Sequence, residues 1–351
     1  MFDQLTSWDN LLLAYRRAAQ GKRSRPDVAA FEHRLEDNLW QLQSELQAQT
    51  YQPLAYHSFF IHDPKRRLIS AADFRDRVVH HALCNLIEPI FERSFIADSY
   101  ANRVGKGTHR ARNRCQQFAR RYPYVLQCDL RQFFPSIDHA ILQDQLARKV
   151  KDVGLLWLID IILSSGKDVL KEQYDMVFFP GDDLLAINRR RGLPIGNLTS
   201  QFWANVYLNP FDHFIKRQLR CPAYLRYVDD FMLFADDKKT LWLWRDALIE
   251  RLATLRLTIH PGAQPHLVTE GISFLGFRIF PDRTRLKQRK GHQYKRKLKR
   301  LIQQYRSRQV GFKQLSQSVR GWVNHARFAN TVGLRKAILT KEIIRPPLNT
   351  D

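Results

Sequence analysis

Three aspartates, far apart in the sequence, form the pattern with the clearest chemical meaning. Asp129 ends the apolar stretch of residues 124–128, which is typical of a buried strand, and Asp229 and Asp230 lie at the centre of a predicted hairpin over residues 224–234. Two adjacent carboxylates at a hairpin tip repel one another unless a cation lies beside them. Divalent Mg²⁺ prefers carboxylate oxygens, and two such ions can clamp the attacking and leaving oxygens of a phosphoryl transfer. The three aspartates therefore predict a two-metal site for phosphoryl transfer.

The alternative interpretation is that Asp129 caps a helix and that Asp229 and Asp230 form a solvated turn. The charge of the chain favours the metal site. The sequence has 57 Lys and Arg residues against 34 Asp and Glu residues, a net charge of +23. Such a surplus attracts polyanions, so nucleic acid is the first expected partner and an anionic membrane surface the second.

Other classes of protein are excluded by composition and spacing. No apolar run reaches the roughly 20 residues of a membrane span, and the N-terminus lacks a signal-peptide pattern. We therefore expect a cytoplasmic protein with no membrane partner. No Cys-x-x-Cys pair occurs among the four widely spaced cysteines, which argues against a disulfide framework or a structural zinc site.

Mixed helices and strands must position these residues. Apolar residues at helical spacing predict helices within residues 1–50 and over residues 73–92, and an aromatic run predicts a strand over residues 56–61. Residues 164–192 are irregular and are interpreted as an insertion. The composition becomes strongly basic beyond residue 281, where we expect a domain boundary.

Two segments resemble the catalytic motifs of reverse transcriptases: Asp129-Leu130-Arg131-Gln132-Phe133-Phe134 and Tyr227-Val228-Asp229-Asp230. The resemblance covers residues 51–340. It implies that Asp129, Asp229 and Asp230 bind two Mg²⁺ ions, with Mn²⁺ as the alternative ion and the Leu130 carbonyl as a further ligand. It also implies that Phe134 lies under the sugar of the incoming nucleotide and excludes a 2′-hydroxyl, although Phe134 could instead be an ordinary core residue.

Further basic motifs match the same family in order. By resemblance, Lys65, Arg67, Arg103 and Lys106 belong to the fingers and hold the triphosphate of the nucleotide, where cations stabilise the charge of phosphoryl transfer. Taken alone, residues 100–109 would be interpreted as a basic surface turn. The basic segment beyond residue 281 is interpreted as a thumb that follows the template–primer backbone. Its expected nucleic-acid contacts are Lys287, Lys290, Lys295, Lys299 and Arg300.

Residues 193–201 indicate the subclass. Most reverse transcriptases have Gln-Gly and later Ser-Pro in this motif, whereas this chain has Ile195-Gly196 and then Ser200-Gln201. That departure resembles the reverse transcriptases of diversity-generating retroelements, which copy a template-repeat RNA into cDNA and misincorporate opposite adenines. The resemblance implies that Ile195, Gly196 and Gln201 lie beside the nucleotide. Many family members also have a lysine in a late palm loop, a candidate proton donor; here that loop has His260 and His266, so that either histidine could replace the lysine or no side-chain acid is used.

The expected architecture is an α+β right-hand polymerase with fingers, a palm built on an antiparallel sheet, and a helical thumb. We expect an N-terminal helical extension over residues 1–50, fingers over 51–122, a palm over 123–280 with the insertion at 164–192, and the thumb over 281–351. The implied partners are template RNA, an RNA or DNA primer, dNTPs and a basic accessory protein of the retroelement. The resemblance implies a protein that a bacterium, an archaeon or a phage encodes. The alternatives are a group II intron-like or retron reverse transcriptase, or a non-catalytic RNA-binding maturation protein.

Overall fold

The computed structural model describes residues 1–62 and 66–340. Two compact units make up the chain. The first contains Met1–Val104, Cys128–Phe231 and Leu243–Ala263, and the second contains Gly105–Gln127, Met232–Trp242 and the residues from Gln264 onward. Within the described residues, no helix has both the length and the apolar character that crossing a bilayer requires.

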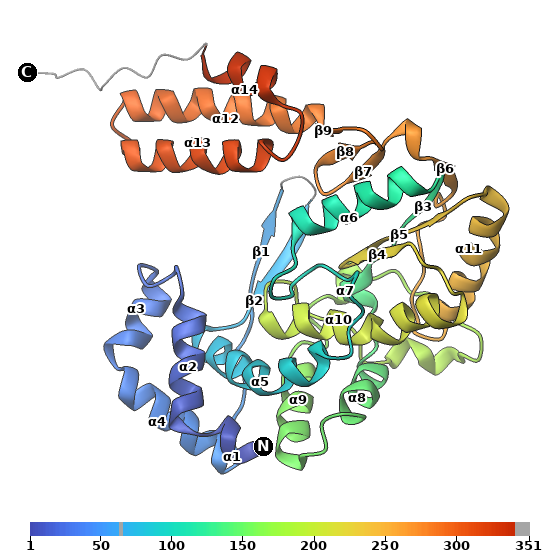
Figure 1. Ribbon diagram of the computed structural model, residues 1–351. Coiled ribbons are helices and arrows are strands. Elements are labelled where there is room, and N and C mark those ends of the chain that lie inside the picture. The colour runs from blue at the N-terminus through green and yellow to red at the C-terminus, as the bar shows by residue number, and fades with distance from the viewer. Residues whose placement is uncertain (63–65, 341–351) are drawn as a thin grey trace, which may run out of the picture. The chain divides into compact units, whose positions relative to one another are not determined.

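Four N-terminal helices form, as the helical spacing of apolar residues predicts; the first three pack on a long helix of the first unit, and the fourth packs on the second and third. They are α1 (Phe2–Leu5), α2 (Trp8–Ala19), α3 (Pro26–His33) and α4 (Leu35–Gln47). Helix α2 packs against α5 (Phe74–Glu92), which lies beside it in Figure 1. Asp73 begins α5 by accepting a hydrogen bond from the amide of Arg75.

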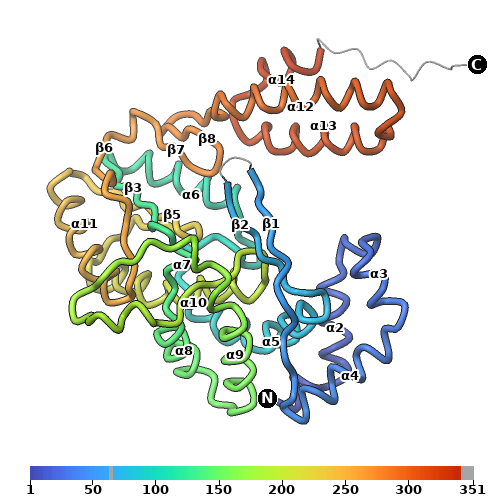
Figure 2. The backbone as a smooth tube through the Cα atoms, turned by 180° about the vertical axis from the view of Figure 1, so that it is seen from behind, coloured from blue at the N-terminus to red at the C-terminus, as the bar shows by residue number. Residues whose placement is uncertain are grey.

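A two-stranded antiparallel ribbon precedes α5. It consists of β1 (His57–Ile61) and β2 (Arg67–Ala71), with Phe59 opposite Ile69, and it is seen from behind in Figure 2. The expected strand over residues 56–61 is thus confirmed as β1. All of β1 is exposed, whereas Ser70 of β2 is fully buried.

Further helices of the first unit lie between the acidic segments. They are α7 (Phe133–Ser136), α8 (His139–Ala147), α9 (Val153–Ser165) and α10 (Leu198–His213), the last continuing into a π-helical turn at Phe214–Gln218. Residues 164–192 contain only the end of α9, two short 3-10 turns, Lys171–Gln173 and Leu184–Asn188, and an isolated bridge from Arg191 to Asp138, so their predicted irregularity is confirmed.

A four-stranded sheet carries the predicted acids, with strand order β4-β5-β3-β6. The strands are β3 (Tyr124–Asp129), β4 (Tyr224–Tyr227), β5 (Asp230–Ala235) and β6 (Pro265–Leu267), and β3 pairs antiparallel with β6. In β5 every residue after Asp230 is buried, which explains its nearly unbroken apolar sequence. Helix α11 (Lys238–Ala253) follows β5.

The second unit combines a small sheet with a helical domain. Helix α6 (Thr108–Arg121) contacts a sheet of β7 (Ile272–Phe274), β8 (Phe277–Ile279) and β9 (Thr284–Leu286). Strand β9 lies beyond residue 281, so the basic segment begins with a strand of this sheet and becomes helical only at α12 (Gln288–Arg306).

Helices α12, α13 (Phe312–Ala326) and α14 (Val332–Leu339) share one core (Figure 1). Tyr294 and Trp322 stack in parallel at its centre, with ring centroids 4.3 Å apart, so Trp322 is a core residue of this helical domain. The opposite face of α12 is basic. Of the predicted nucleic-acid contacts there, Lys287, Lys295, Lys299 and Arg300 are exposed and Lys290 is half-buried.

Candidate active site

The backbone brings the first and second predicted acids together. Strand β3 ends at Asp129, and the amide of the next residue, Leu130, donates a 3.3 Å hydrogen bond to the carbonyl of Asp229. The carbonyl of Asp129 accepts a 3.0 Å bond from the amide of His260 on its other side. Two residues that are 100 positions apart in the sequence are therefore neighbours across adjacent strands.

A strained turn presents Asp229 and Asp230. Val228 has φ of 58°, a left-handed conformation that is costly for a β-branched residue. The carbonyl of Val228 accepts a 3.0 Å hydrogen bond from Nη1 of Arg226. Because Arg226 lies on β4 just before the turn, this bond ties the strained residue back to the strand.

Arg226 itself belongs to a buried polar network. Its side chain is 1% exposed, and its Nε and Nη2 atoms form a two-pronged ion pair with Asp212, which is fully buried, at 2.8 and 2.7 Å. The hydroxyl of Tyr224 donates to the same carboxylate at 2.6 Å, and Nη1 of Arg226 also donates to Asn205 at 3.2 Å. This network explains how a strained acidic turn is held in place. Sequence reasoning missed it, because Arg226 and Asp212 lie 14 residues apart in no recognisable motif.

The electrostatics of the acids suit a cation. Burial and, next, the negative charge of Asp129 raise the pKa of Asp229, while the charge of Arg67 opposes that rise. A divalent ion between Asp129 and Asp229 would remove the repulsion, and its usual protein ligands are one or two carboxylates. Within residues 1–62 and 66–340, no three His, Cys, Asp or Glu side chains are already gathered as a metal site. The structure thus brings Asp129 and Asp229 together, with Asp230 next to them at the start of β5.

The two histidines of the late palm loop have different surroundings. Nε2 of His260 lies 3.7 Å from Oδ2 of Asp129, and both side chains are about half exposed. His266, by contrast, lies on β6 opposite Val125 of β3. Of the two, His260 is the one beside the predicted acids, where it can orient the Asp129 carboxylate or move a proton.

The segment that indicated the subclass is fastened to β2. The carbonyl of Ile195 accepts a 2.8 Å bond from the amide of Ser70, and the side chain of Asn197 bonds both to the carbonyl of Ser70 and to the amide of Ala72, each at 2.9 Å. Gly196 has φ of 126°, and a Cβ there would lie 3.0 Å from the Ile69 side chain. Glycine is needed at this point for its conformation and for this close approach. Gln201 is half-buried in the first turn of α10.

The remaining predicted nucleotide contacts differ from one another. Phe134 is half-buried, in contrast to Phe133, which is 2% exposed, so Phe134 is the aromatic with an accessible face. Arg67 is exposed, and its positive charge lowers the pKa of Asp229, opposing the effect of burial. Lys65 lies outside the described residues, and Lys106 is half-buried on the loop before α6.

The structure argues against the predicted triphosphate contact of Arg103. Its guanidinium forms an ion pair with Glu92 at 2.6 Å and donates to the carbonyls of Ile96 and Ser99 at 2.6 and 2.9 Å. The side chain is only 5% exposed. Arg103 therefore holds the loop to the end of α5, and a phosphate would have to displace these bonds.

Several known proteins are similar to this chain. The profile of the family described as "Reverse transcriptase (RNA-dependent DNA polymerase)" matches residues 62–279. Protein YkfC of Escherichia coli (strain K12) is 26% identical over 296 residues, which is 72% of this chain and 74% of that protein. The group II intron-encoded protein LtrA of Lactococcus lactis subsp. cremoris is 24% identical over 183 residues, 51% of this chain and 28% of LtrA. The structure of apo telomerase from Candida tropicalis superimposes with a TM-score of 0.48 and 12% identity, covering 67% of this chain and 49% of that one.

Proposed function

The chain belongs to the reverse transcriptase family of RNA-dependent DNA polymerases, and from this premise we propose that it adds deoxynucleotides to a primer 3′-hydroxyl on an RNA template at Asp129, Asp229 and Asp230. The observation that carries the proposal is the meeting of Asp129 and Asp229 through the 3.3 Å bond between Leu130 and Asp229. Burial and the charge of Asp129 raise the pKa of Asp229, as expected of carboxylates that share a cation site.

Divalent ions, with Mg²⁺ proposed and Mn²⁺ as the alternative, would supply charge neutralisation for the attacking and leaving oxygens of the transfer. Asp129 and Asp229 would hold them, with Asp230 and the Leu130 carbonyl as further ligands. Arg226 keeps the acidic turn in place through the carbonyl of Val228. The accessible face of Phe134 would lie against the sugar, and the exposed guanidinium of Arg67 would face the phosphates.

A finer proposal concerns the subclass. We infer a diversity-generating retroelement enzyme that copies a template-repeat RNA with adenine-biased errors, works in the cytoplasm and binds a basic accessory protein. The support is the apolar Ile195, which has no side-chain polar group to offer a nucleotide, and Gln201. The loss of a polar contact would loosen selection of the paired base.

A second candidate is a group II intron-type reverse transcriptase. It is favoured by the likeness to LtrA, although the chain spans only 28% of that protein. Sequencing the cDNA made on an RNA template separates the two candidates. Errors concentrated opposite template adenines support the retroelement enzyme, and uniformly accurate copying supports the intron type.

Primer extension on an RNA template with Mg²⁺ tests the general proposal. The double variant Asp229→Asn/Asp230→Asn should lose extension, while the matched variant Asp236→Asn/Asp237→Asn, which changes another adjacent pair of acids just after β5, should retain it. Unchanged synthesis by the first variant would remove Asp229 and Asp230 from the active site. Loss of synthesis together with retained RNA binding would distinguish a catalytic defect from misfolding.

A further inference from the structure

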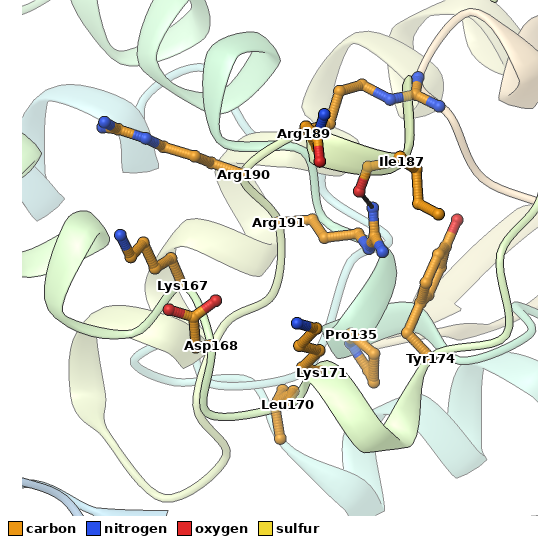
Figure 3. A pocket seen from close by; sticks show the side chains of 11 residues that line it. Pro135, Lys167, Asp168, Leu170, Lys171, Tyr174, Ile187, Arg189, Arg190 and Arg191 are labelled. Atoms are coloured by element: carbon orange, nitrogen blue, oxygen red, sulfur yellow. Dashed lines mark hydrogen bonds between the residues drawn. The ribbon is translucent and has the colours of Figure 1, made fainter. Parts of the chain in front are cut away.

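The predicted insertion contains a basic pocket that the polymerase chemistry does not use. The pocket has a volume of ≈ 260 Å³ and is lined by Pro135, the segment after α9 and residues 187–191. Its lining includes five cationic residues, Lys167, Lys171, Arg189, Arg190 and Arg191, against the single carboxylate of Asp168, and the Arg189 side chain points away from the other four (Figure 3).

Two of the arginines are held in place. Arg189 forms a two-pronged ion pair with Asp182, at 2.9 and 2.6 Å, so its charge is balanced within the protein. Arg191 lies over the ring of Tyr174, with its guanidinium carbon 4.2 Å from the ring centroid, and bonds to the carbonyl of Ile187 (Figure 3). A stacked guanidinium keeps edge donors available for a phosphate.

The other cations remain exposed and unbalanced. Lys167, Lys171 and Arg190 are all exposed. Among residues 1–62 and 66–340, no ion pair joins any of these three, or Arg191, to a carboxylate. Like charges that line one pocket repel one another, and a bound polyanion would relieve the repulsion.

The pocket has a rigid connection to the segment that follows Asp129. The amide of Leu193 donates to the carbonyl of Phe134 at 2.9 Å, that of Gly192 to Ile137 at 2.8 Å, and that of His139 to Arg190 at 3.0 Å. The basic residues are therefore not on a loose loop. Arg190 and Arg191 lie on a strip of backbone bonded to residues 134–139, which begin at Phe134, the aromatic with an accessible face, whereas Lys167 and Lys171 lie on the segment after α9.

We propose that this pocket binds a phosphodiester group of the single-stranded RNA template, with Lys167, Lys171 and Arg190 as the phosphate contacts and Arg191, oriented by Tyr174, as a fourth. The inference rests on the proposed polymerase function for the identity of the strand. The chemistry is that of a phosphate; a free nucleotide or pyrophosphate would offer the same group. The backbone bonds to residues 134–139 favour the strand, because they fix the pocket beside the segment where the template must be copied.

The test compares two variants that each lose three positive charges. The pocket variant is Lys167→Gln/Lys171→Gln/Arg190→Gln, and the control is Arg16→Gln/Arg93→Gln/Lys151→Gln, three exposed cations of the same unit that lie outside the pocket. Binding of a fluorescent single-stranded RNA is measured in EDTA at several salt concentrations. Each lost phosphate contact lowers the magnitude of the slope of log affinity against log salt by about 0.7. The slope of the pocket variant should therefore be smaller than that of wild-type protein by about 2, and the slope of the control should change much less.

Three results would overturn the proposal. One is a slope that falls by less than about 0.5 in the pocket variant, or that falls equally in the control. Another is a pocket variant whose RNA binding is no longer inhibited by inorganic pyrophosphate but whose slope of log RNA affinity against log salt equals that of wild-type protein. That result would assign the pocket to a free anion. The third is a wild-type protein that binds no RNA.

Failure of the pocket and failure of the proposed function can be told apart by primer extension. If wild-type protein extends primers while the pocket variant keeps its RNA slope, the pocket inference is wrong and the polymerase function stands. If the pocket variant loses slope while wild-type protein extends no primer, the RNA site stands and the catalytic proposal fails. Thermal unfolding of both variants should match wild-type, since all six substituted side chains are exposed.

Discussion

The buried pair of Arg226 and Asp212 should control both the stability of the protein and the position of its acidic turn. Replacing Arg226 by Met leaves the carboxylate of Asp212 uncompensated in the interior, where the two side chains are 1% and 0% exposed. Breaking such a pair costs about 3–5 kcal/mol, and losing the bond to the Val228 carbonyl costs about 1 kcal/mol more. The sum is a large fraction of the roughly 5–15 kcal/mol that stabilises a typical domain.

A second variant separates stability from position. In Arg226→Met/Asp212→Leu both charges are gone, so most of the lost free energy of unfolding should return. The strained Val228 would still lack its bond to residue 226, and Asp229 and Asp230 would shift. Because a displacement of about 1 Å can cost about 100-fold in rate, we expect extension by the double variant to fall by roughly that factor.

The measurements are urea unfolding and single-turnover primer extension across a Mg²⁺ titration. The matched control is Tyr224→Phe, which removes one hydroxyl bond to Asp212, costs about 1 kcal/mol and leaves the Arg226 bond to Val228 intact. The reasoning is refuted if the double variant extends primers at the wild-type rate and Mg²⁺ dependence. It is refuted equally if the double variant is as unstable as Arg226→Met alone.

Three further predictions concern other parts of the first unit. Burial, with smaller effects from His81 and Arg77, lowers the pKa of His80 to about 3, so the folded state binds its proton less readily than the unfolded chain does. The free energy of unfolding therefore has its full value above pH 6.5, where His80 is neutral in both states, and decreases as the pH falls toward 3, by about 2 kcal/mol at pH 5. His80→Leu should flatten that part of the plot of unfolding free energy against pH. An unchanged plot would contradict the prediction. Asp138→Ala should cost about 2 kcal/mol in urea unfolding, because Asp138 caps α8 and pairs with Arg256, whereas Asp144→Ala, which breaks an exposed pair with Arg148, should cost under about 1 kcal/mol. Ile195→Gln should reduce misincorporation opposite template adenines in sequenced cDNA, and an unaltered error spectrum would show that residue 195 does not set accuracy.

The elements that the sequence predicted are those with a strong local signal. The apolar runs before Asp129 and around Asp229 and Asp230 became β3, β4 and β5, because a strand buried among other elements needs apolar residues throughout. The helical N-terminal region also follows from spacing, whereas the helices after residue 287 were expected from the basic composition and from the resemblance to reverse transcriptases. The identity of the acids as catalytic residues stays a prediction.

What the sequence could not predict depends on partners that are distant in the chain. Nothing in the local sequence of Arg103 indicates that Glu92 and two carbonyls occupy its guanidinium, so charge alone suggested a phosphate contact. The choice between His260 and His266 likewise needed strand register, since β6 places His266 opposite Val125. The network around Arg226 is visible only after α10 and β4 are placed together.

The bonds between β2 and the start of α10 have a mechanical consequence. Three hydrogen bonds of 2.8–2.9 Å join Ser70 and Ala72 to Ile195 and Asn197, and Gly196 lies close to the side chain of Ile69. We expect a ribbon and a helix joined by these bonds to move together. Any displacement of the β1–β2 ribbon, in which Arg67 begins β2, would therefore also displace the start of α10, the helix that carries Gln201.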